Sequence, residues 1–423
     1  MNTVRFPYGR TFMELHIDEK NLKAVLSNKG ISQTAEKPEA QYVLDALKNP
    51  VGTKPLHEIA KGKKKVLLVT SDHTRAVPSR ITLPILLAEI RKGNPDADIT
   101  ILIATGLHRA TTEAEQRRMF GDSIVDHERI VCHNAFDSSA MRYVCSLPSG
   151  AEFYVNHLAM EADLLVTEGF IEPHFFAGFS GGRKSILPGI ASAETVNENH
   201  SFRAIASPYA RAGVLKENPI SADMVYAARK VNVQFILNVA LDENKKIIAA
   251  FAGDLEQAHE RGCAFVNELA RVNAVTGDIV ITSNGGYPLD QNLYQAPKAA
   301  STAEACAGEN GVIILIASCM DGLGGENFAR LMQMGTASEI QRHLSSIPPK
   351  ESISEQWCVQ IFSQMLMKHT IILVTKGIDP ETIRKINMIP AGSVDEALEI
   401  AYGIKGKNAS VVAIPDGVAV MAV

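Results

Sequence analysis

The sequence predicts an α/β protein with two α/β domains, mainly parallel sheets, and the active site in the cleft between the domains. Two patterns predict this class: short runs of Val, Ile and Leu that fit strands buried on both faces, and intervening segments whose apolar residues recur with helical spacing. The third observation is length, because 423 residues suffice for two or three domains with cores of their own.

The expected strands lie, in chain order, within residues 64–74, 97–108, 161–170, 233–241, 278–286, 311–318, 369–375 and 409–417. Each contains an apolar core such as VLLV or VIILI, which is typical of a central parallel strand. Helices are expected between them, at 79–93, 255–272 and 393–406 among others, because their apolar positions recur every three to four residues. No internal repeat is visible.

The domain boundary is expected near residues 270–277, where a long helical pattern ending in RVNAVTG gives way to a new strand. We therefore expect an N-terminal domain over residues 1–272 and a C-terminal domain over 273–423. The last strand of the chain is a candidate to return to the first domain.

Composition indicates an ordinary soluble globular protein, with 46% hydrophobic and 21% charged residues. A net charge of −5 gives no support for a nucleic-acid or membrane partner. The sequence starts without an apolar signal-peptide core and contains no run of eighteen apolar residues. Its six cysteines are scattered without a CxxC pair, so we expect reduced thiols and a cytoplasmic location.

Polar residues gather where the expected strands end. Residues 72–75 follow the first apolar run, 105–109 follow the second, Glu172 and His174 follow the third, and 284–287 follow the run DIVITS at 278–283. Ligands of open parallel sheets bind outside the carboxyl ends of the strands. One cleft between two such domains would bring these clusters together.

The loop PHFFAGFSGGRKSILPG, residues 173–189, resembles a phosphate-binding P-loop. Gly178 to Ser185 matches G-x-x-x-x-G-K-S except that Arg183 replaces the last glycine, and the following ILPG soon ends any helix. These departures disfavour nucleotide triphosphate hydrolysis. Arg183 and Lys184 still suit a phosphate-bearing cofactor, and the alternative is a loop that only turns tightly.

Two of the twelve histidines, His108 and His174, lie just past strand ends beside glycine or arginine, where an imidazole can exchange protons near neutral pH. His200, in TVNENHSF, is a weaker candidate for a metal ligand. No HExxH spacing accompanies it, so zinc hydrolysis is poorly supported. Ordinary surface or hydrogen-bonding roles are expected for His16, His57, His127, His259 and His343.

Two cations are candidates for binding a carboxylate. Arg75, in SDHTR, offers a planar fork of donors, although a salt bridge with Asp72 is the alternative. Lys298 falls near the start of an expected helix and could reach a ligand, although a solvated lysine is the alternative.

Together these segments resemble the lactate racemase family that uses a nickel-pincer nucleotide. The resemblance is carried by SDHTR at 71–75, TGLHRATTEAE at 105–115, the loop at 173–189, NENH at 197–200 and NGGYPLDQNLYQAPKA at 284–299. It extends over most of the chain, from about residue 5 to the C-terminal strand. These motifs are specific for the family but not for lactate within it.

The resemblance implies a role for each matching residue. Lys184 matches the lysine that anchors the nucleotide through a thioamide, and His200 matches the nickel ligand. His108 and His174 match the paired acid/base histidines. Substrate-binding and cofactor-binding roles are implied for the remaining matches: Arg75, Lys298 and Gln295 for the substrate, and Asp72, Thr74, Tyr294 and Trp357 for the cofactor.

The implied activity is that of a 2-hydroxy acid racemase or epimerase, with lactate as the expected substrate. The implied cofactors are nickel and pyridinium-3,5-bisthiocarboxylic acid mononucleotide, and the implied partners are the enzymes that synthesise it. In this chemistry the substrate Cα gives up a hydride reversibly and passes through a planar 2-oxo acid. Residues 1–272 would then be the catalytic and cofactor-anchoring domain. The alternatives are the same chemistry on a malate-like, aromatic or sugar acid, or a nucleotide-binding protein without catalysis.

Overall fold

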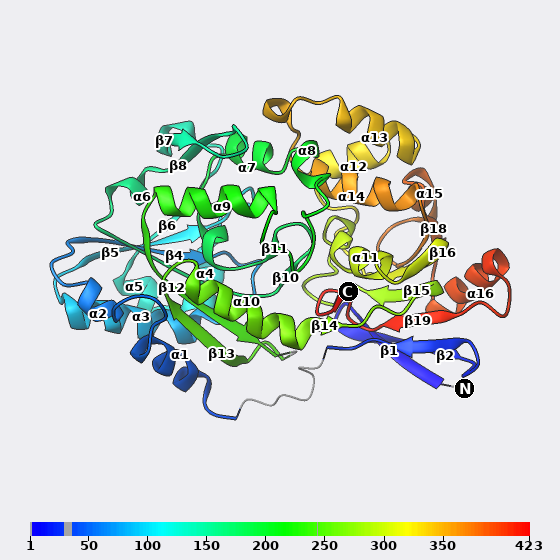
Figure 1. Cartoon of the computed structure of the whole chain (residues 1–423), viewed down its shortest axis with the longest axis horizontal. Helices are drawn as coiled ribbons and strands as arrows, with labels where there is room; N and C mark the ends of the chain where they lie inside the picture. Colours follow the sequence, from blue (N-terminus) through cyan, green and yellow to red (C-terminus); the bar gives the residue numbers. More distant parts are fainter. Residues whose placement is uncertain (1, 29–35, 243) are drawn as a thin grey trace. The chain divides into compact units, whose positions relative to one another are not determined.

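The computed structural model describes residues 2–28, 36–242 and 244–423, and it confirms the α/β class (Figure 1). Its contacts divide the chain into two compact units. The terminal unit comprises the described parts of Met1–Lys29, His200–Ala206 and Leu269–Val423, and the middle unit comprises those of Gly30–Asn199 and Ser207–Glu268. The expected N-terminal domain, residues 1–272, included the segments Met1–Lys29 and His200–Ala206, which here belong to the terminal unit.

The middle unit is built on one sheet, whose described strands follow the order β13-β12-β9-β4-β5-β6. All neighbours are parallel except β12 and β13, which form an antiparallel pair. The strands are β13 (Ile247–Gly253), β12 (Val233–Leu241), β9 (Leu164–Phe170), β4 (Lys65–Ser71), β5 (Asp98–Ala104) and β6 (Arg129–Cys132).

Helices cover both faces of this sheet (Figure 1). One face packs into an apolar core with α1 (Glu39–Lys48), α2 (Leu56–Ile59), α3 (Ser79–Gly93), α4 (Glu113–Phe120) and α5 (Asp122–His127). The other face meets α6 (His157–Glu161), α9 (Pro219–Lys230) and the 3₁₀ turn η3 (Gly182–Ser185). Burial on both faces explains the continuous apolar runs in the strands.

The remaining elements of the middle unit are short, apart from the long helix α10. The hairpin β7 (Met141–Ser146) and β8 (Glu152–Asn156) follows the turn η2 (Ser138–Ala140), and β10 (Pro173–His174) pairs with β11 (Gly178–Phe179). The helices are α7 (Ala193–Asn199) and α10 (Gln257–Ala270), and the second of these ends just inside the terminal unit.

The terminal unit is built on a second sheet, in which all paired strands are parallel and whose described order is β18-β17-β16-β15-β19-β3. The strands are β18 (Ile389–Ala391), β17 (Thr370–Val374), β16 (Ala307–Ile316), β15 (Gly277–Ser283), β19 (Val411–Ile414) and β3 (Leu22–Val25). The chain's first and last segments therefore meet in one sheet.

One face of this second sheet packs on α16 (Val394–Lys405) and on the hairpin β1 (Asn2–Tyr8) and β2 (Thr11–Ile17). Helix α11 (Pro297–Glu304) packs on β15 and β16, and α14 (Gln356–Leu366) packs on α11. The remaining elements are α8 (Phe202–Ile205), η4 (Leu293–Gln295), α12 (Glu326–Met332), α13 (Ala337–Ser345), η5 (Pro349–Glu351), α15 (Pro380–Lys385), and the parallel pair β14 (Arg271–Val272) and β20 (Met421–Ala422).

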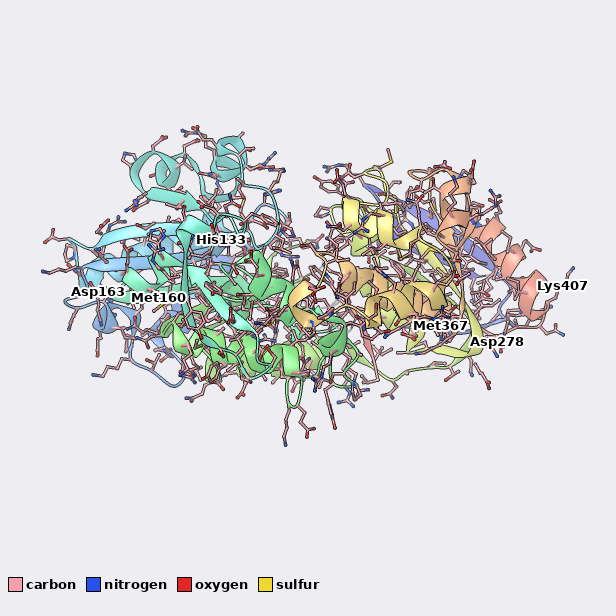
Figure 2. All side chains as sticks on the ribbon, turned by 90° about the horizontal axis from the view of Figure 1, so that it is seen from above. His133, Met160, Asp163, Asp278, Met367 and Lys407 are labelled. Carbon is pink, nitrogen blue, oxygen red and sulfur yellow. The ribbon has the colours of Figure 1, made fainter. Side chains whose placement is uncertain are left out.

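The amino-terminal edges of the two sheets carry carboxylates that tie strands together. Asp163 accepts hydrogen bonds from the backbone N–H groups of Lys64 and Lys65, and Asp278 accepts them from the N–H and hydroxyl of Ser410. Both aspartates are labelled in Figure 2. These acidic groups are therefore structural, whereas the candidate functional residues follow the opposite ends of the strands. No helix in the described part of the chain is long and apolar enough to cross a membrane.

Candidate functional site

Three loops of the middle unit begin at the carboxyl ends of neighbouring parallel strands. Ser71 at the end of β4 pairs with Ala104 at the end of β5, and β9 runs on the other side of β4. The loops after these strands carry Asp72, His108 and His174 respectively, as expected. A hydrogen bond of 3.0 Å from Gly106 N–H to Gly189 O joins the second loop to the end of the third.

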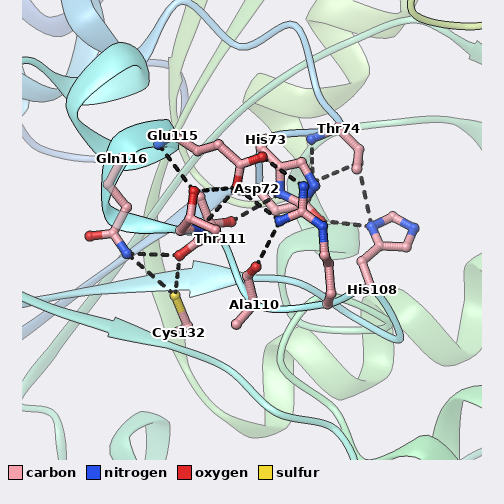
Figure 3. A network of polar contacts seen from close by, with 11 residues as sticks. Asp72, His73, Thr74, His108, Ala110, Thr111, Glu115, Gln116 and Cys132 are labelled. Carbon is pink, nitrogen blue, oxygen red and sulfur yellow. Dashed lines mark hydrogen bonds and ion pairs between the residues drawn. The ribbon is translucent and has the colours of Figure 1, made fainter.

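Asp72 and His108 form a hydrogen-bonded pair across the first two loops (Figure 3). His108 Nδ1 lies 2.7 Å from Asp72 Oδ2, while Thr74 donates to Oδ1 through its N–H at 3.1 Å and its hydroxyl at 2.6 Å. A carboxylate can only accept, so the ring proton of a neutral His108 resides on Nδ1. The Nε2 atom therefore carries a lone pair, on a side chain that is 35% exposed.

The Asp72 carboxyl is held in its ionised form. Burial by itself raises its pKa, but the hydrogen bond and charge of His108, the charge of Arg75 and the hydrogen bond from Thr74 outweigh burial and lower the pKa to about 2. Within the described residues, no ion pair joins Arg75 to Asp72. The alternative prediction, a salt bridge between Arg75 and Asp72, is therefore wrong. The Arg75 side chain is exposed and available to bind a ligand.

A second layer of polar contacts holds these loops (Figure 3). Glu115 on α4 accepts two hydrogen bonds from the Arg109 guanidinium, at 2.7 and 2.9 Å, and it also caps the helix through Thr112. His73 lies 3.2 Å from the Thr111 hydroxyl and 3.9 Å from the Glu115 carboxylate. Glu115 was not predicted as a site residue, although the T-x-x-E pattern of a capping box is present at 112–115.

A buried carboxyl lies on β9, beside β4. Glu168 accepts hydrogen bonds from Thr70 at 2.5 Å and Ser79 at 2.6 Å, and from Thr82 through its other oxygen. Burial raises the pKa of Glu168, although the three hydroxyl groups lower it in part. Nothing in the sequence distinguishes this glutamate from a surface residue, because the hydroxyl groups come from β4 and α3.

The third loop brings His174 and Lys184 together. Lys184 Nζ lies 3.4 Å from His174 Nε2 and 5.7 Å from the centre of the Phe176 ring. His174 is also fixed by aromatic contacts with Phe175 and Phe176, and its Nδ1 accepts from Ala177 N–H at 3.3 Å. A backbone N–H can only donate, so the Ala177 contact needs Nδ1 as the acceptor, whereas a Lys184 ammonium needs Nε2 as the acceptor. A neutral His174 can satisfy one of these two contacts at a time.

The glycines of this loop are required by the packing of the protein itself. Gly178 has φ +80°, and a Cβ there would lie 2.4 Å from Val214 O. Gly182 has φ +52°, and a Cβ there would lie 2.8 Å from the His259 ring. The loop therefore turns tightly against its own unit at these two positions.

The structure places Arg183 differently from the expectation that it would serve a phosphate. Its side chain is buried, only 2% exposed, and its guanidinium donates to Ala177 O at 2.7 Å. It also contacts Ser221 on α9 at 3.3 Å and His259 on α10 at 2.9 Å. Of the two cations expected to serve a phosphate, Arg183 is thus turned into the protein, and half-buried Lys184 contacts His174.

The terminal unit holds the other sequence-predicted residues. His200 follows α7 and packs edge-to-face on Trp357, with ring centres 4.9 Å apart. Trp357 Nε1–H donates to the Tyr294 hydroxyl at 3.1 Å, and burial raises the pKa of Tyr294 well above its ordinary value. Gln295 ends η4, and Lys298 is the second residue of α11, near the helix start as expected.

The predicted residues thus form three groups: Asp72, Thr74, Arg75 and His108; His174 and Lys184; and His200, Tyr294 and Trp357, with Gln295 and Lys298 close to Tyr294 in the chain. Some histidines outside these groups have the ordinary roles expected of them. His16 pairs with Asp395 and His57 with Glu89. His259 has a hydrogen-bonding role, as expected: it packs behind the lysine-bearing loop and lies 2.9 Å from Arg183 Nη1.

Two known domain families match the chain. The family described as "Lactate racemase N-terminal domain" matches residues 8–213, and "Lactate racemase C-terminal domain" matches residues 272–422. The protein named "Lactate racemase" from Thermoanaerobacterium thermosaccharolyticum is 48% identical over 422 residues, covering 100% of this chain and 99% of that protein. The one of the same name from Lactiplantibacillus plantarum is 47% identical over 422 residues, covering 100% of both.

Solved structures show the same likeness. The lactate racemase apoprotein from Thermoanaerobacterium thermosaccharolyticum has a TM-score of 0.96 and 48% identity, with 100% of both chains covered. A protein from Thermotoga maritima has a TM-score of 0.68 and 20% identity, covering 91% of this chain and 98% of that one. The second likeness shows the fold alone.

Proposed function

The chain belongs to the lactate racemase family, and we propose that it is an isomerase that interconverts the two enantiomers of lactate. One observation supports this proposal most: two histidines lie in neighbouring loops of one unit, and each ring is held by partners of its own. His108 Nδ1 donates to Asp72, so its Nε2 can accept a proton, whereas His174 carries a proton on Nε2 when its Nδ1 accepts from Ala177. A racemase needs both a base and an acid, and their roles exchange with the direction of reaction.

His108 is proposed to act as the base toward one enantiomer. Its Nε2 takes the hydroxyl proton of the substrate, and the ionised Asp72 carboxylate stabilises the imidazolium that results. Thr74 keeps the carboxylate oriented by two hydrogen bonds to its other oxygen. A base whose free nitrogen is held in one orientation is what general base catalysis requires.

His174 is proposed to return a proton to the substrate oxygen, and to act as the base for the opposite enantiomer. The stacked Phe175 and the edge of Phe176 hold its ring, so its orientation does not depend on the substrate. Because the 2-oxo acid is planar at carbon, it can be reduced on either face. Two proton-transfer groups then account for both products.

The residues present fit the nickel-pincer nucleotide that the resemblance implies. Lys184 is half-buried on a fixed turn, with its amine beside an imidazole, which suits a covalent anchor. His200 offers a buried imidazole, a donor that nickel accepts together with sulfur. When bound, this group supplies the carbon that takes the Cα hydride and gives it back. Tyr294 and Trp357 are proposed to hold the His200 ring.

Arg75 is proposed to bind the substrate carboxylate through its guanidinium fork, with Lys298 and Gln295 as further contacts. Its exposure supports this role, since Asp72 is paired with His108 instead. A cytoplasmic location and maturation by cofactor-synthesis enzymes belong to the same proposal. All six cysteines are free thiols in the structure.

The test is to produce the protein together with the cofactor-synthesis enzymes and to measure intact mass, nickel content and chirality of lactate over time. We expect an adduct on Lys184, about one nickel per chain, and approach to a racemic mixture from either enantiomer. Lys184→Arg is the matched variant, because it keeps the charge but cannot form a thioamide, and it should lose adduct and activity together.

Assays of inversion on a panel of larger 2-hydroxy acids test the identity of the substrate separately from the racemisation mechanism. If loaded protein inverts a malate-like, aromatic or sugar acid but not lactate, the proposed substrate is wrong and the proposed mechanism stands. Loaded protein that inverts none would leave a nucleotide-binding protein. An active Lys184→Arg variant that keeps its adduct would disprove the covalent anchor.

A further inference from the structure

Arg183 is a buried cation whose described contacts include no carboxylate. Its contacts are the backbone oxygens of Ala177 and, at 3.5 Å, Gly181, together with Ser221 and His259. Its Nε atom has no hydrogen-bond partner among the described residues. Burial lowers the pKa of Arg183 to about 10, so the group is still charged at neutral pH. Burying a charge in this way is costly, which argues for a role beyond packing.

The partners of Arg183 are neutral. Burial and the charge of Arg183 lower the pKa of His259 to about 3, so its ring does not share a positive charge with the guanidinium. His259 Nε2 lies within hydrogen-bonding distance of both Arg183 Nη1, at 2.9 Å, and Ser180 O, at 2.8 Å. Since Arg183 can only donate, Nε2 is its acceptor when the ring proton is on Nδ1, the atom that lies 3.6 Å from Cys263 Sγ.

Ala177 connects Arg183 to the candidate acid/base residue. Arg183 donates to the carbonyl of Ala177 at 2.7 Å, and the N–H of the same residue donates to His174 Nδ1 at 3.3 Å. The Ala177 N–H favours the tautomer of His174 that carries its proton on Nε2, and a Lys184 ammonium favours the other tautomer. The guanidinium thus fixes a residue that contacts His174 directly.

Lys184 is connected to Arg183 through the chain itself. Both residues lie in η3, where Gly182 N–H is held by Asn238 Oδ1 at 2.9 Å. Arg183 points into the space between α9 and α10, and the next residue presents its amine beside His174. A turn anchored from its inner side gives a long, flexible lysine a fixed point of attachment.

We propose that Arg183 is a positioning residue, which holds Lys184 and His174 in place from the interior of the middle unit. This inference rests on the proposed function of Lys184 as the anchor, and it assigns Arg183 no contact with substrate or cofactor. The consequence is that the arginine departing from the P-loop pattern serves the lysine beside it instead of a phosphate.

The test compares Arg183→Met with the unaltered protein and with Arg91→Met. Methionine replaces the buried cation with an apolar chain of similar length. Arg91 provides the matched control, because it is a partly exposed arginine of the same unit that pairs with Glu128. Folding is checked by circular dichroism and thermal unfolding. Two readouts follow: relative acetylation of each lysine by acetic anhydride before cofactor loading, and the rate at which the Lys184 adduct appears during maturation.

We expect Arg183→Met to fold, to change the acetylation of Lys184 beyond the spread of the other lysines, and to slow adduct formation by about 10- to 100-fold, the cost of misplacing a reacting group by about an ångström. Arg91→Met should match the unaltered protein in both readouts. A folded Arg183→Met that forms the adduct at the normal rate overturns the inference.

The two proposals fail in different ways. If the unaltered protein forms no adduct on Lys184, the proposed anchor is wrong, and acetylation alone then decides whether Arg183 positions the lysine. If Arg183→Met does not fold, Ser221→Val removes one partner and leaves the cation in place. It should slow adduct formation in the same direction, and a normal rate in that variant overturns the inference.

Discussion

His108 Nδ1 lies 2.7 Å from Oδ2 of Asp72, and the two residues are 36 positions apart in the chain. The carboxylate is buried and ionised, and its other oxygen is fully engaged by Thr74. This arrangement sets which nitrogen of His108 carries the proton. The pair is therefore the part of the site whose chemistry is most directly open to test.

Asp72→Asn should reverse the tautomer of His108. Thr74 donates twice to Oδ1, so the amide of an asparagine keeps its oxygen there and turns its NH₂ toward His108 Nδ1. Nε2 would then carry the proton and could not act as a base. We expect kcat to fall within the range of about 10²–10⁴-fold that a positioned base supplies, with adduct and nickel retained.

Asp137→Asn is the matched control for this change. Asp137 accepts from the N–H and hydroxyl of Ser139 in the same pattern, but on the surface and without a histidine. Its kinetics should match those of the unaltered enzyme. A normal kcat in loaded Asp72→Asn would show that the pair has no catalytic role.

Arg75→Lys should weaken substrate binding more than cofactor loading, because a point ammonium cannot replace a two-pronged contact with a carboxylate. The expected loss in kcat/KM corresponds to about 1.5–3 kcal/mol, the scale of one charged hydrogen bond. Steady-state kinetics on protein of equal nickel content measures it. Arg229→Lys, at a surface pair with Glu256, is the control. Unchanged kinetics in Arg75→Lys would remove this residue from the substrate site.

His200→Ala should lower nickel content while the organic adduct stays on Lys184, because the covalent bond and the metal bond are separate. Metal analysis and intact mass on the same sample distinguish the two losses. His57→Ala is the control, since His57 is paired with Glu89 and has no proposed role at the site. Normal nickel content in His200→Ala would exclude His200 as the ligand.

Glu168→Gln should change how stability depends on pH. Burial raises the pKa of Glu168 in the folded protein above its ordinary value of 4.5. Its contribution to stability is therefore fully present below that value and is lost as pH rises through the folded-state pKa. Glutamine keeps the oxygen that accepts from Thr70 and Ser79, and Thr82 can donate to Pro78 O instead.

Chemical unfolding at pH 5 and pH 8 measures this effect. The unaltered protein should lose more stability between the two values than Glu168→Gln does. Equal losses in both proteins would mean that the buried carboxyl does not titrate in this range.

Continuous apolar sequence made the central elements predictable. The helix expected at 79–93 is α3, Ser79–Gly93, and the runs at 64–74 and 161–170 contain β4 and β9. These segments are buried on both faces, so their periodicity reports their structure directly. The positions of His108 and His174 past strand ends followed from the same reading, because parallel strands carry their ligand-binding loops at one edge.

Pairing between distant segments could not be predicted in the same way. For Arg75 the sequence left open a salt bridge with Asp72 as the alternative to ligand binding, but the partner of Asp72 is His108 from the next loop. Arg183 has the appearance of a ligand-binding residue in its loop, and only the packing of α9 and α10 against that loop turns it inward. The roles of Lys184 as the anchor and of His200 as the nickel ligand stay predictions. The cleft expected between the domains also stays a prediction.

The two ends of the chain share one sheet, and this connection sets the order in which the protein can be completed during synthesis. Strand β3 pairs with β19 through Leu22 and Val411. Synthesis adds about 5–20 residues per second, so β3 is made roughly 20 to 80 s before β19. The apolar side of the β1–β2 hairpin waits with β3, because its core partners lie in β15, β16 and α16. The middle unit, whose strands are complete by Gly253, can fold during that interval, and the N-terminal hairpin is left as the nascent chain's longest-lived exposed apolar surface.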